Sequence, residues 1–529
     1  MSNMTRRSFT QVTAAATLAA TKWMSAAAAA IEPRVKGKLA ADVSGKTIPI
    51  NRMIFGQFLE HFHRQVYGGV FDPGSPLADE KGFRLDVIEA LRELRVPIVR
   101  WPGGCFVSAY HWRDGVGKDR KPSFNKAWGV EDLNTFGTDE FVHWCRLIGA
   151  EPYICTNAGT GTEEEMSDWV EYCNLKDQGL NAKMRIESGT PEPFNVRYWS
   201  IGNENYLGGE IGAKTVEEWA SLVRESAKMM RAVDSRIKIL AAATVNGNWT
   251  PPMLQAAGKY LDYISIHGYW DPLWQHGTHP ADYLKCMSHC EAPEKQIKQA
   301  IDLLDQNGVG DRVRIAFDEW NLRGWHHPGF PGGGGDRLDL IRERDDNDLN
   351  ETYTVADAVF SASFLNSCLR NATHVQMACM APVVNVRGPL YVYDKGIVKR
   401  TTFHVLKMYS SLLEDNVLDG STTSSDPLDT GSGVVPALDA VTTCSSDKKR
   451  FALAMINRDP ERAAEWQLNL HGFDPRQGVR ITVLSGKSKD SFNDTDHPNA
   501  VVTENVSHQT ASGPLLLPPH SVSVVQFSV

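Results

Sequence analysis

The chain has few cysteines and, beyond its first thirty residues, no long apolar run, and each scarcity excludes a class of protein. Nine cysteines scattered over 529 residues are too sparse to form a disulfide framework, so we interpret them mostly as buried thiols. No later stretch reaches the roughly 18 apolar residues that cross a bilayer. We therefore expect a mature chain with no membrane partner.

Positive charge is not concentrated anywhere in the sequence. Lysine and arginine number 55 against 64 acidic residues, a net charge of −9, and no segment gathers them into a basic stripe. Nucleic acid is therefore not an expected partner. The hydrophobic fraction of 42% and charged fraction of 22% are ordinary for globular proteins, so the length allows two to four domains, or one barrel with an appendage.

Residues 1–30 have the composition of an export leader. Arg6 and Arg7 precede an alanine-rich apolar run, and the small residues 26–30 offer cleavage sites. The pair followed by Ser8 and Phe9 resembles a twin-arginine signal, which is read by a receptor and exports folded chains. We predict a periplasmic or extracellular protein; the alternative is an ordinary secretory leader with two chance arginines.

Eight short apolar runs recur along residues 51–400, with helical patterns between most of them. Trp219, Leu222, Val223 and Met230 follow helical spacing after a capping box at Thr215, and similar patterns occur elsewhere. Strands that alternate with helices indicate right-handed parallel crossovers, and eight of them predict a closed (β/α)8 TIM barrel. The alternative, an open doubly wound sheet, lacks the expected glycine-rich turn after the first strand. The predicted strands are 54–61, 98–102, 152–157, 196–204, 237–244, 263–269, 314–320 and 374–380.

The amino-acid composition and the apolar pattern change beyond residue 400. Ser, Thr, Asp and Gly crowd residues 420–446, and alternating apolar runs follow between turn residues. We predict an antiparallel β-sandwich over 401–529, with residues 31–50 joining it as a strand.

Two glutamates close predicted strands on opposite parts of the barrel. Glu204 follows the fourth strand and Glu319 follows the seventh. Catalytic groups of such barrels lie at the carboxyl ends of the strands, so both face one mouth. A pair in which one carboxyl is protonated and the other ionised is typical of glycoside cleavage.

Other strand ends supply groups that suit a sugar pocket, namely carboxylate, amide, phenol and indole. Arg100, beside a Pro-Gly-Gly turn, is interpreted as orienting a catalytic carboxylate more than as touching substrate. His267 is either a site residue or a core histidine. The further candidates are Glu60, Asn203, Tyr269 and Trp320.

Metal-dependent and nucleophile-dependent hydrolases fit less well. His61 and His63 resemble the paired histidines of metal-binding barrels, but the fifth and eighth predicted strands end without a carboxylate or histidine. The cluster around Cys286 offers at most half a zinc site. No Gly-x-Ser-x-Gly elbow occurs, and Cys105 has no evident histidine base.

Several of these segments resemble glycoside hydrolase family 51, whose best-known members are α-L-arabinofuranosidases. The similarity spans nearly the whole mature chain, and the Arg-Trp-Pro-Gly-Gly block is its most specific part. It rests chiefly on residues 56–61 (GQFLEH), 100–106 (RWPGGCF), 110–115 (YHWRDG), 198–204 (YWSIGNE) and 318–321 (DEWN).

The resemblance implies a retaining, exo-acting furanosidase that needs no cofactor and acts on arabinose-containing plant polysaccharides or oligosaccharides. By the match, Glu204 is the acid/base and Glu319 the nucleophile. Positions that hold or border the sugar in the family correspond to Glu60, Asn203, Tyr269, Trp128 and Cys105. A homo-oligomer remains open.

One departure from the family pattern concerns the end of the eighth strand. Members commonly carry a sugar-contacting glutamine where this chain has Pro382, which has no donor. The contact is then either made by another residue or absent because the sugar differs. A galactofuranoside, a xyloside or a β-glucan is therefore an alternative substrate for the same mechanism. A carbohydrate-binding protein without catalysis is a further alternative, against which the intact glutamate pair argues. The loop 323–348 is particular to this chain and is a candidate substrate wall.

Overall fold

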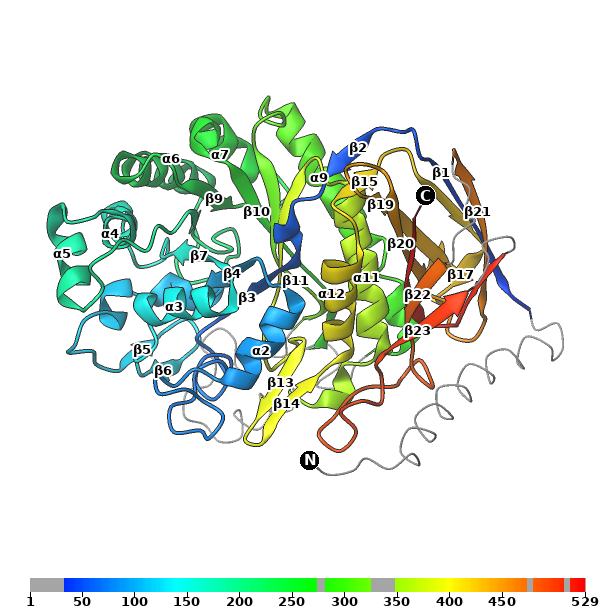
Figure 1. The fold of residues 1–529 in the computed structure, drawn as a ribbon. Coiled ribbons are helices and arrows are strands. Elements are labelled where there is room, and N and C mark those ends of the chain that lie inside the picture. The colour runs from blue at the N-terminus through cyan, green and yellow to red at the C-terminus, as the bar shows by residue number, and fades with distance from the viewer. Residues whose placement is uncertain (1–32, 274–280, 325–347, 473–478, 509–513, 529) are drawn as a thin grey trace.

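The structure is a computed structural model that describes residues 33–273, 281–324, 348–472, 479–508 and 514–528. The eight expected strands are all present and close into a parallel barrel, which confirms the predicted fold class (Figure 1). In chain order they are β3 (Gly56–Phe58), β4 (Ile98–Trp101), β7 (Glu151–Thr156), β8 (Tyr198–Ile201), β9 (Lys238–Ala242), β10 (Tyr263–Pro272), β11 (Arg314–Gly324) and β12 (Val375–Met380).

Helices cover the outside of this barrel and bury the apolar stripes that the sequence shows. At α6, Thr215 accepts from the Glu218 backbone N–H and the Glu218 carboxylate returns the bond, as the capping box predicts. At α4 only Thr162 caps, because the Glu165 carboxylate binds His111 instead. The helices are α2 (Leu85–Leu94), α3 (Thr138–Ile148), α4 (Glu163–Asn174), α5 (Gly179–Glu187), α6 (Val216–Val233), α7 (Thr250–Ala257), α8 (Tyr283–Met287), α9 (Ala292–Gln306), α11 (Val355–Arg370) and α12 (Thr401–Leu412).

Two larger sheets form beyond the barrel, besides the two-stranded pair β17 (Pro427–Asp429) and β18 (Val434–Pro436), and residues near the amino end contribute to both larger sheets. Strand β1 (Val35–Asp42) lies between β16 (Thr422–Ser425) and β21 (Ala464–His471) in a four-stranded sheet that ends with β24 (Leu515–Leu517). The larger sheet runs in the order β2 (Thr47–Pro49), β15 (Asn416–Leu418), β19 (Leu438–Cys444), β20 (Arg450–Asn457), β25 (Ser521–Ser528), β22 (Val479–Leu484) and β23 (Thr503–His508).

The barrel and the sheets are joined by α11 and α12, which lie between them (Figure 1). The two sheets meet where Gly37 of β1 leaves room for the buried Leu438 and Trp466 side chains. The first C-terminal strand begins only at residue 416, because α12 occupies the residues directly after 400. The leader and most of the loop 323–348 lie outside the described residues.

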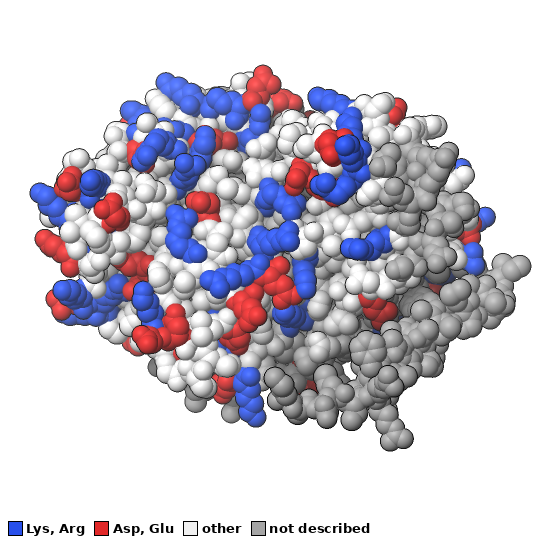
Figure 2. All heavy atoms as spheres, viewed as in Figure 1, with Lys and Arg blue, Asp and Glu red and all other residues white. Residues whose placement is uncertain are grey.

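The described surface agrees with the mixed charge of the sequence. Figure 2 shows lysine and arginine interspersed with acidic residues on the face drawn. Among the described residues, none of the helices has the length and apolar character to cross a membrane. All nine cysteines are free thiols, and eight of them are buried.

Candidate active site

The two glutamates meet at the carboxyl end of the barrel. Glu204 follows β8, and Glu319 lies in β11. One carboxylate oxygen from each, together with a ring nitrogen of His267, lie within 4.8 Å of one another. The backbone at Glu204 has a φ of 45°, a left-handed conformation that is uncommon for non-glycine residues and recurs at functional sites.

Glu319 is held as a carboxylate by three neighbours. Its Oε1 accepts from Arg100 Nη1 at 2.7 Å, its Oε2 accepts from the Tyr269 hydroxyl at 2.8 Å, and His267 Nδ1 lies 3.6 Å from Oε2. Burial opposes ionisation, yet the charges of His267 and Arg100 hold the pKa of Glu319 below its ordinary value. Such a group suits a nucleophile.

Arg100 is wholly buried next to Glu319 and links several residues of the site. Besides Glu319 it donates from Nη2 to Asn203 Oδ1 at 2.8 Å, and its Nε lies 3.3 Å from Asp318 Oδ2. Asp318, which the sequence reasoning did not single out, also accepts from the hydroxyl of Tyr153 at 2.6 Å. Its buried charge balances the guanidinium.

His267 bridges the two glutamates. Its Nδ1 lies 2.8 Å from Glu204 Oε1, and its Nε2 lies 3.6 Å from Asp318 Oδ1. Burial alone would lower the pKa of this histidine, but the charge of Glu319 and the bonds to Asp318 and Glu204 outweigh it and raise the pKa to about 10. Of the two interpretations of His267, the structure supports the site residue, present as a cation.

Glu60 faces the same mouth from the end of β3. Its Oε1 accepts from Trp128 Nε1 at 2.9 Å and from the backbone N–H of Gly104 at 2.9 Å. Burial and the charge of Glu319 raise the pKa of Glu60 to about 7. The loop passes so close that a Cβ on Gly103 would lie 2.3 Å from Glu60 Cγ, and one on Gly104 would lie 2.8 Å from Glu319 Oε1. The two glycines of the Pro-Gly-Gly turn are therefore needed.

Asn203 and Cys105 complete the inner wall. The amide nitrogen of Asn203 is buried and has no hydrogen-bond partner among the described residues, so it is available to an incoming hydroxyl. The thiol of Cys105 hydrogen-bonds Glu210, whose Oε1 also accepts from Ser108 at 2.7 Å. Glu210 is a carboxyl group that sequence reasoning missed, and burial raises its pKa to about 7.

Of the two tryptophans proposed for the site, the structure places one at the site and the other outside it. Trp128 lies against Glu60 and stacks on Phe62, with ring centroids 4.3 Å apart. Trp320 is not in the site, and its inclusion was wrong. Its ring is buried against Phe364 of α11, with centroids 3.8 Å apart. Trp320 therefore points out of the barrel towards α11, whereas Glu319 points inward to Arg100.

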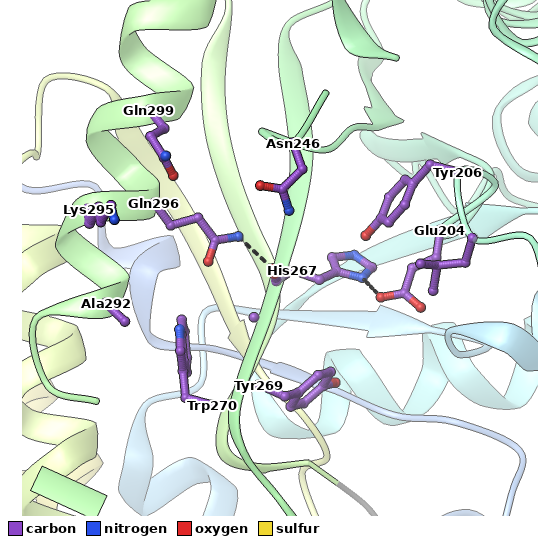
Figure 3. Close-up of a pocket in the computed structure, with 12 residues that line it drawn as sticks. Glu204, Tyr206, Asn246, His267, Tyr269, Trp270, Ala292, Lys295, Gln296 and Gln299 are labelled. Carbon is purple, nitrogen blue, oxygen red and sulfur yellow. Dashed lines mark hydrogen bonds and ion pairs between the residues drawn. The ribbon is translucent and has the colours of Figure 1, made fainter. Parts of the chain in front are cut away.

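A cavity of about 500 Å³ opens from Glu204 towards α9. Figure 3 shows Glu204, Tyr206 and His267 at one end, with Gln296 and Lys295 of α9 across from them. Gln296 Nε2 donates to the His267 carbonyl at 2.7 Å, which fixes this wall to β10. The wall was not foreseen from the strand ends, because it comes from a helix.

The arrangement does not favour metal binding by the paired histidines. His61 Nδ1 contacts Asp132 Oδ2 at 2.7 Å inside an aromatic cluster, away from the glutamate pair. Among the described residues, only Glu204, His267 and Glu319 are grouped closely enough to hold an ion. A histidine with a pKa of about 10 keeps its proton and is a poor ligand.

Comparisons with known proteins point in one direction. Residues 90–285 match the model of the α-L-arabinofuranosidase 1 domain, and residues 318–521 match that of the α-L-arabinofuranosidase C-terminal domain. α-L-Arabinofuranosidase C of Emericella nidulans is 33% identical over 507 residues, which is 90% of this chain and 95% of that protein.

Two bacterial proteins extend the comparison. An intracellular exo-α-(1→5)-L-arabinofuranosidase of Halalkalibacterium halodurans is 31% identical, covering 86% of this chain and 91% of the relative. The solved structure of a thermostable glycoside hydrolase family 51 α-L-arabinofuranosidase of Thermotoga petrophila superposes with a TM-score of 0.81 at 31% identity, over 93% of this chain and 100% of that one.

Proposed function

The chain belongs to the α-L-arabinofuranosidases of glycoside hydrolase family 51, and from this membership we propose that it releases arabinofuranose from the non-reducing ends of plant polysaccharide side chains or oligosaccharides, with retention of configuration. The observation that carries the proposal is the distance between Glu204 and Glu319. Retaining glycosidases hold their carboxyl groups about 5 to 5.5 Å apart, whereas inverting enzymes leave room for a water at about 6.5 to 9.5 Å. In this structure one oxygen of each carboxylate lies within 4.8 Å of the other, close enough for both groups to contact the same anomeric centre, which supports the retaining class.

The proposed reaction has two displacements. The ionised Glu319 attacks the anomeric carbon while Glu204 protonates the departing oxygen, and a glycosyl ester forms on Glu319. The charge of Glu319 disappears in this ester. Glu204, which gave its proton to the leaving group, is now the base: it takes a proton from a water molecule whose oxygen attacks the anomeric carbon. The bond between the sugar and Glu319 breaks, which restores the Glu319 carboxylate and the Glu204 acid. The protonated leaving group departs through the cavity that begins at Glu204.

The remaining polar groups support binding of the glycone. The Asn203 amide nitrogen, which has no hydrogen-bond partner in the described part of the chain, and the Glu60 carboxyl group are the groups we assign to the sugar, while Arg100 fixes Asn203 and Glu319 relative to each other. Because Arg100, Asp318 and His267 are linked before substrate arrives, the carboxylates need little reorganisation in the transition state.

The direct test is hydrolysis of p-nitrophenyl α-L-arabinofuranoside followed by proton NMR. We expect the α-anomer of arabinose to appear first and the β-anomer only as mutarotation proceeds. A panel of aryl β-D-galactofuranoside, β-D-xyloside and β-D-glucoside tests the glycone. First appearance of the β-anomer, or faster cleavage of another glycoside, contradicts the mechanism or the sugar respectively.

Removing the charge of His267 should move the acid side of the pH profile. In His267→Gln the cation that lowers the pKa of Glu319 is lost, so that pKa rises. Glu319 must be ionised to attack. The acid limb of the pH profile of kcat/KM should therefore move to higher pH by about one pH unit. The measurement is kcat/KM of the aryl arabinofuranoside from pH 3 to 9. An acid limb that stays in place argues against this role.

We also propose export by the twin-arginine route, supported by Arg6, Arg7 and the alanine-rich segment after them. In Arg6→Lys/Arg7→Lys the receptor signal is lost while the charge is kept, so the full-length protein should accumulate unprocessed in the cytoplasm. Cell fractionation with immunoblotting measures this in a host with a twin-arginine system. A matched Lys22→Arg variant should be exported as the parent is, and continued export of the double variant would indicate an ordinary secretory leader.

A further inference from the structure

Arg387 brings a guanidinium next to Tyr269, at the edge of the site. It lies in the loop after β12, a few residues beyond Pro382, where the family resemblance leads one to expect a sugar-contacting amide. Its Cζ is 4.5 Å from the centroid of the Tyr269 ring, and the Tyr269 hydroxyl donates to Glu319 at 2.8 Å. Arg387 therefore sits one side chain away from the nucleophile.

The backbone that carries Arg387 is strained and firmly held. Asn385 and Val386 have φ angles of 57° and 48°, a region that a β-branched residue such as valine strongly disfavours. The Asn385 side chain accepts from Val392 N at 2.7 Å, and Asn321 Nδ2 donates to the carbonyls of Arg387 and Ala381, both at 3.0 Å. Strain of this kind persists where surrounding contacts fix it, and it clusters at ligand sites.

The guanidinium has hydrogen-bonding capacity to spare. Of its five N–H groups, the one on Nε donates to the Ala381 carbonyl at 3.0 Å. Among the described residues, no hydrogen-bond or ion-pair partner is found for Nη1 or Nη2, although the side chain is partly buried. Its charge also acts on both Glu319 and Tyr269. A fixed cation with unused donors beside a nucleophile is suited to hold a ligand oxygen.

We propose that Arg387 is a substrate-binding residue of the glycone pocket, which donates from its terminal nitrogens to a hydroxyl oxygen of the furanose and supplies the contact that Pro382 cannot make. This inference rests on the proposed function for the identity of the ligand. Stacking on Tyr269 keeps the guanidinium plane in place, so the contact costs little ordering when the sugar binds.

The first test compares Arg387→Met and Arg387→Gln with the parent enzyme. Losing a hydrogen bond should raise both KM and the inhibition constant of free L-arabinose by roughly five- to tenfold in Arg387→Met, and by less in Arg387→Gln, which keeps a donor. Lys395→Ala, which removes an exposed charge from the hairpin that follows, is the matched control and should change neither constant. An unchanged inhibition constant in Arg387→Met overturns the proposal.

The second test separates direct contact from a structural effect. Monodeoxy aryl arabinofuranosides are assayed with the parent and with Arg387→Met. If Arg387 binds one hydroxyl, the substrate that lacks this hydroxyl should have a lower kcat/KM with the parent enzyme but nearly the same kcat/KM as the full substrate with the variant. The other deoxy sugars should lower kcat/KM equally in both proteins. Full additivity at every hydroxyl overturns the assignment. If the parent prefers another furanoside, the proposed sugar fails, and the same cycle run on that furanoside still tests Arg387.

Discussion

Replacing Glu319 with alanine should lower kcat on aryl α-L-arabinofuranosides by roughly 10⁴-fold, the scale seen when a member of a catalytic unit is removed. The reason is that no other described carboxylate lies where it could attack the anomeric carbon. Glu60 also lies near Glu319, but burial and the charge of Glu319 raise the pKa of Glu60 to about 7, so it is a weaker nucleophile at acidic pH. Steady-state kinetics of purified Glu319→Ala measures the loss.

The assignment is sharpened by chemical rescue. The space left in Glu319→Ala admits a small anion, and azide there should attack the same face of the sugar once and yield β-arabinofuranosyl azide. Glu319→Gln fills the same space, so it should be as slow as Glu319→Ala and azide should not restore its activity. Because Glu319 is hydrogen-bonded to the buried Arg100 and to Tyr269, circular dichroism should first verify that both variants are folded before their rates are compared. Near-normal turnover of Glu319→Ala would refute the role of Glu319.

The barrel could be predicted because its signal is repeated. Eight buried strands must each be apolar, and helices between them must each have an apolar stripe, so one ambiguous run does not change the count. The positions of Glu204 and Glu319 then follow from topology alone, since the carboxyl ends of parallel strands share one rim. For the same reason Glu60 and Tyr269 could be assigned without any distance.

What the sequence did not reveal depends on local departures from regular geometry. The register between β10 and β11 shifts between Ser265 and His267, and this irregularity lets both Asp318 and Glu319 contact Arg100. A regular alternation would have turned Asp318 outward. The strand-end argument also placed Trp320 at the barrel mouth, although the Trp320 side chain packs against α11.

Other residues were missed because loops and helices bring them in. Glu210 lies in the segment after Glu204 and reaches Cys105 only through a turn that no periodic pattern describes. Arg387 depends on two left-handed residues before it, Asn385 and Val386, neither of which is glycine, so no sequence signal marked the turn. A search for polar residues within ten positions of each strand end would have found both.

Replacing Glu204 with alanine should produce an effect that depends on the leaving group. For an arabino-oligosaccharide, whose alkoxide leaves poorly, loss of the general acid should lower kcat/KM by about 10² to 10⁴-fold. For a 2,4-dinitrophenyl arabinofuranoside, which needs no protonation, kcat/KM should stay within roughly tenfold of the parent. The control is Glu210→Gln, a change at a neighbouring buried carboxyl that should show no such dependence on the leaving group.

The second half of the reaction makes this variant diagnostic. With the dinitrophenyl substrate, Glu319 still forms the ester quickly, but no base activates water, so a burst of dinitrophenol should precede a slow steady state. Azide needs no base and should accelerate that slow phase, giving α-arabinofuranosyl azide because it attacks after one inversion has already occurred. The opposite azide anomers from the Glu204 and Glu319 variants can arise only if Glu319 bears the sugar and Glu204 handles the proton. If both variants gave the same anomer, the two roles could not be assigned as proposed, however close the carboxylates lie.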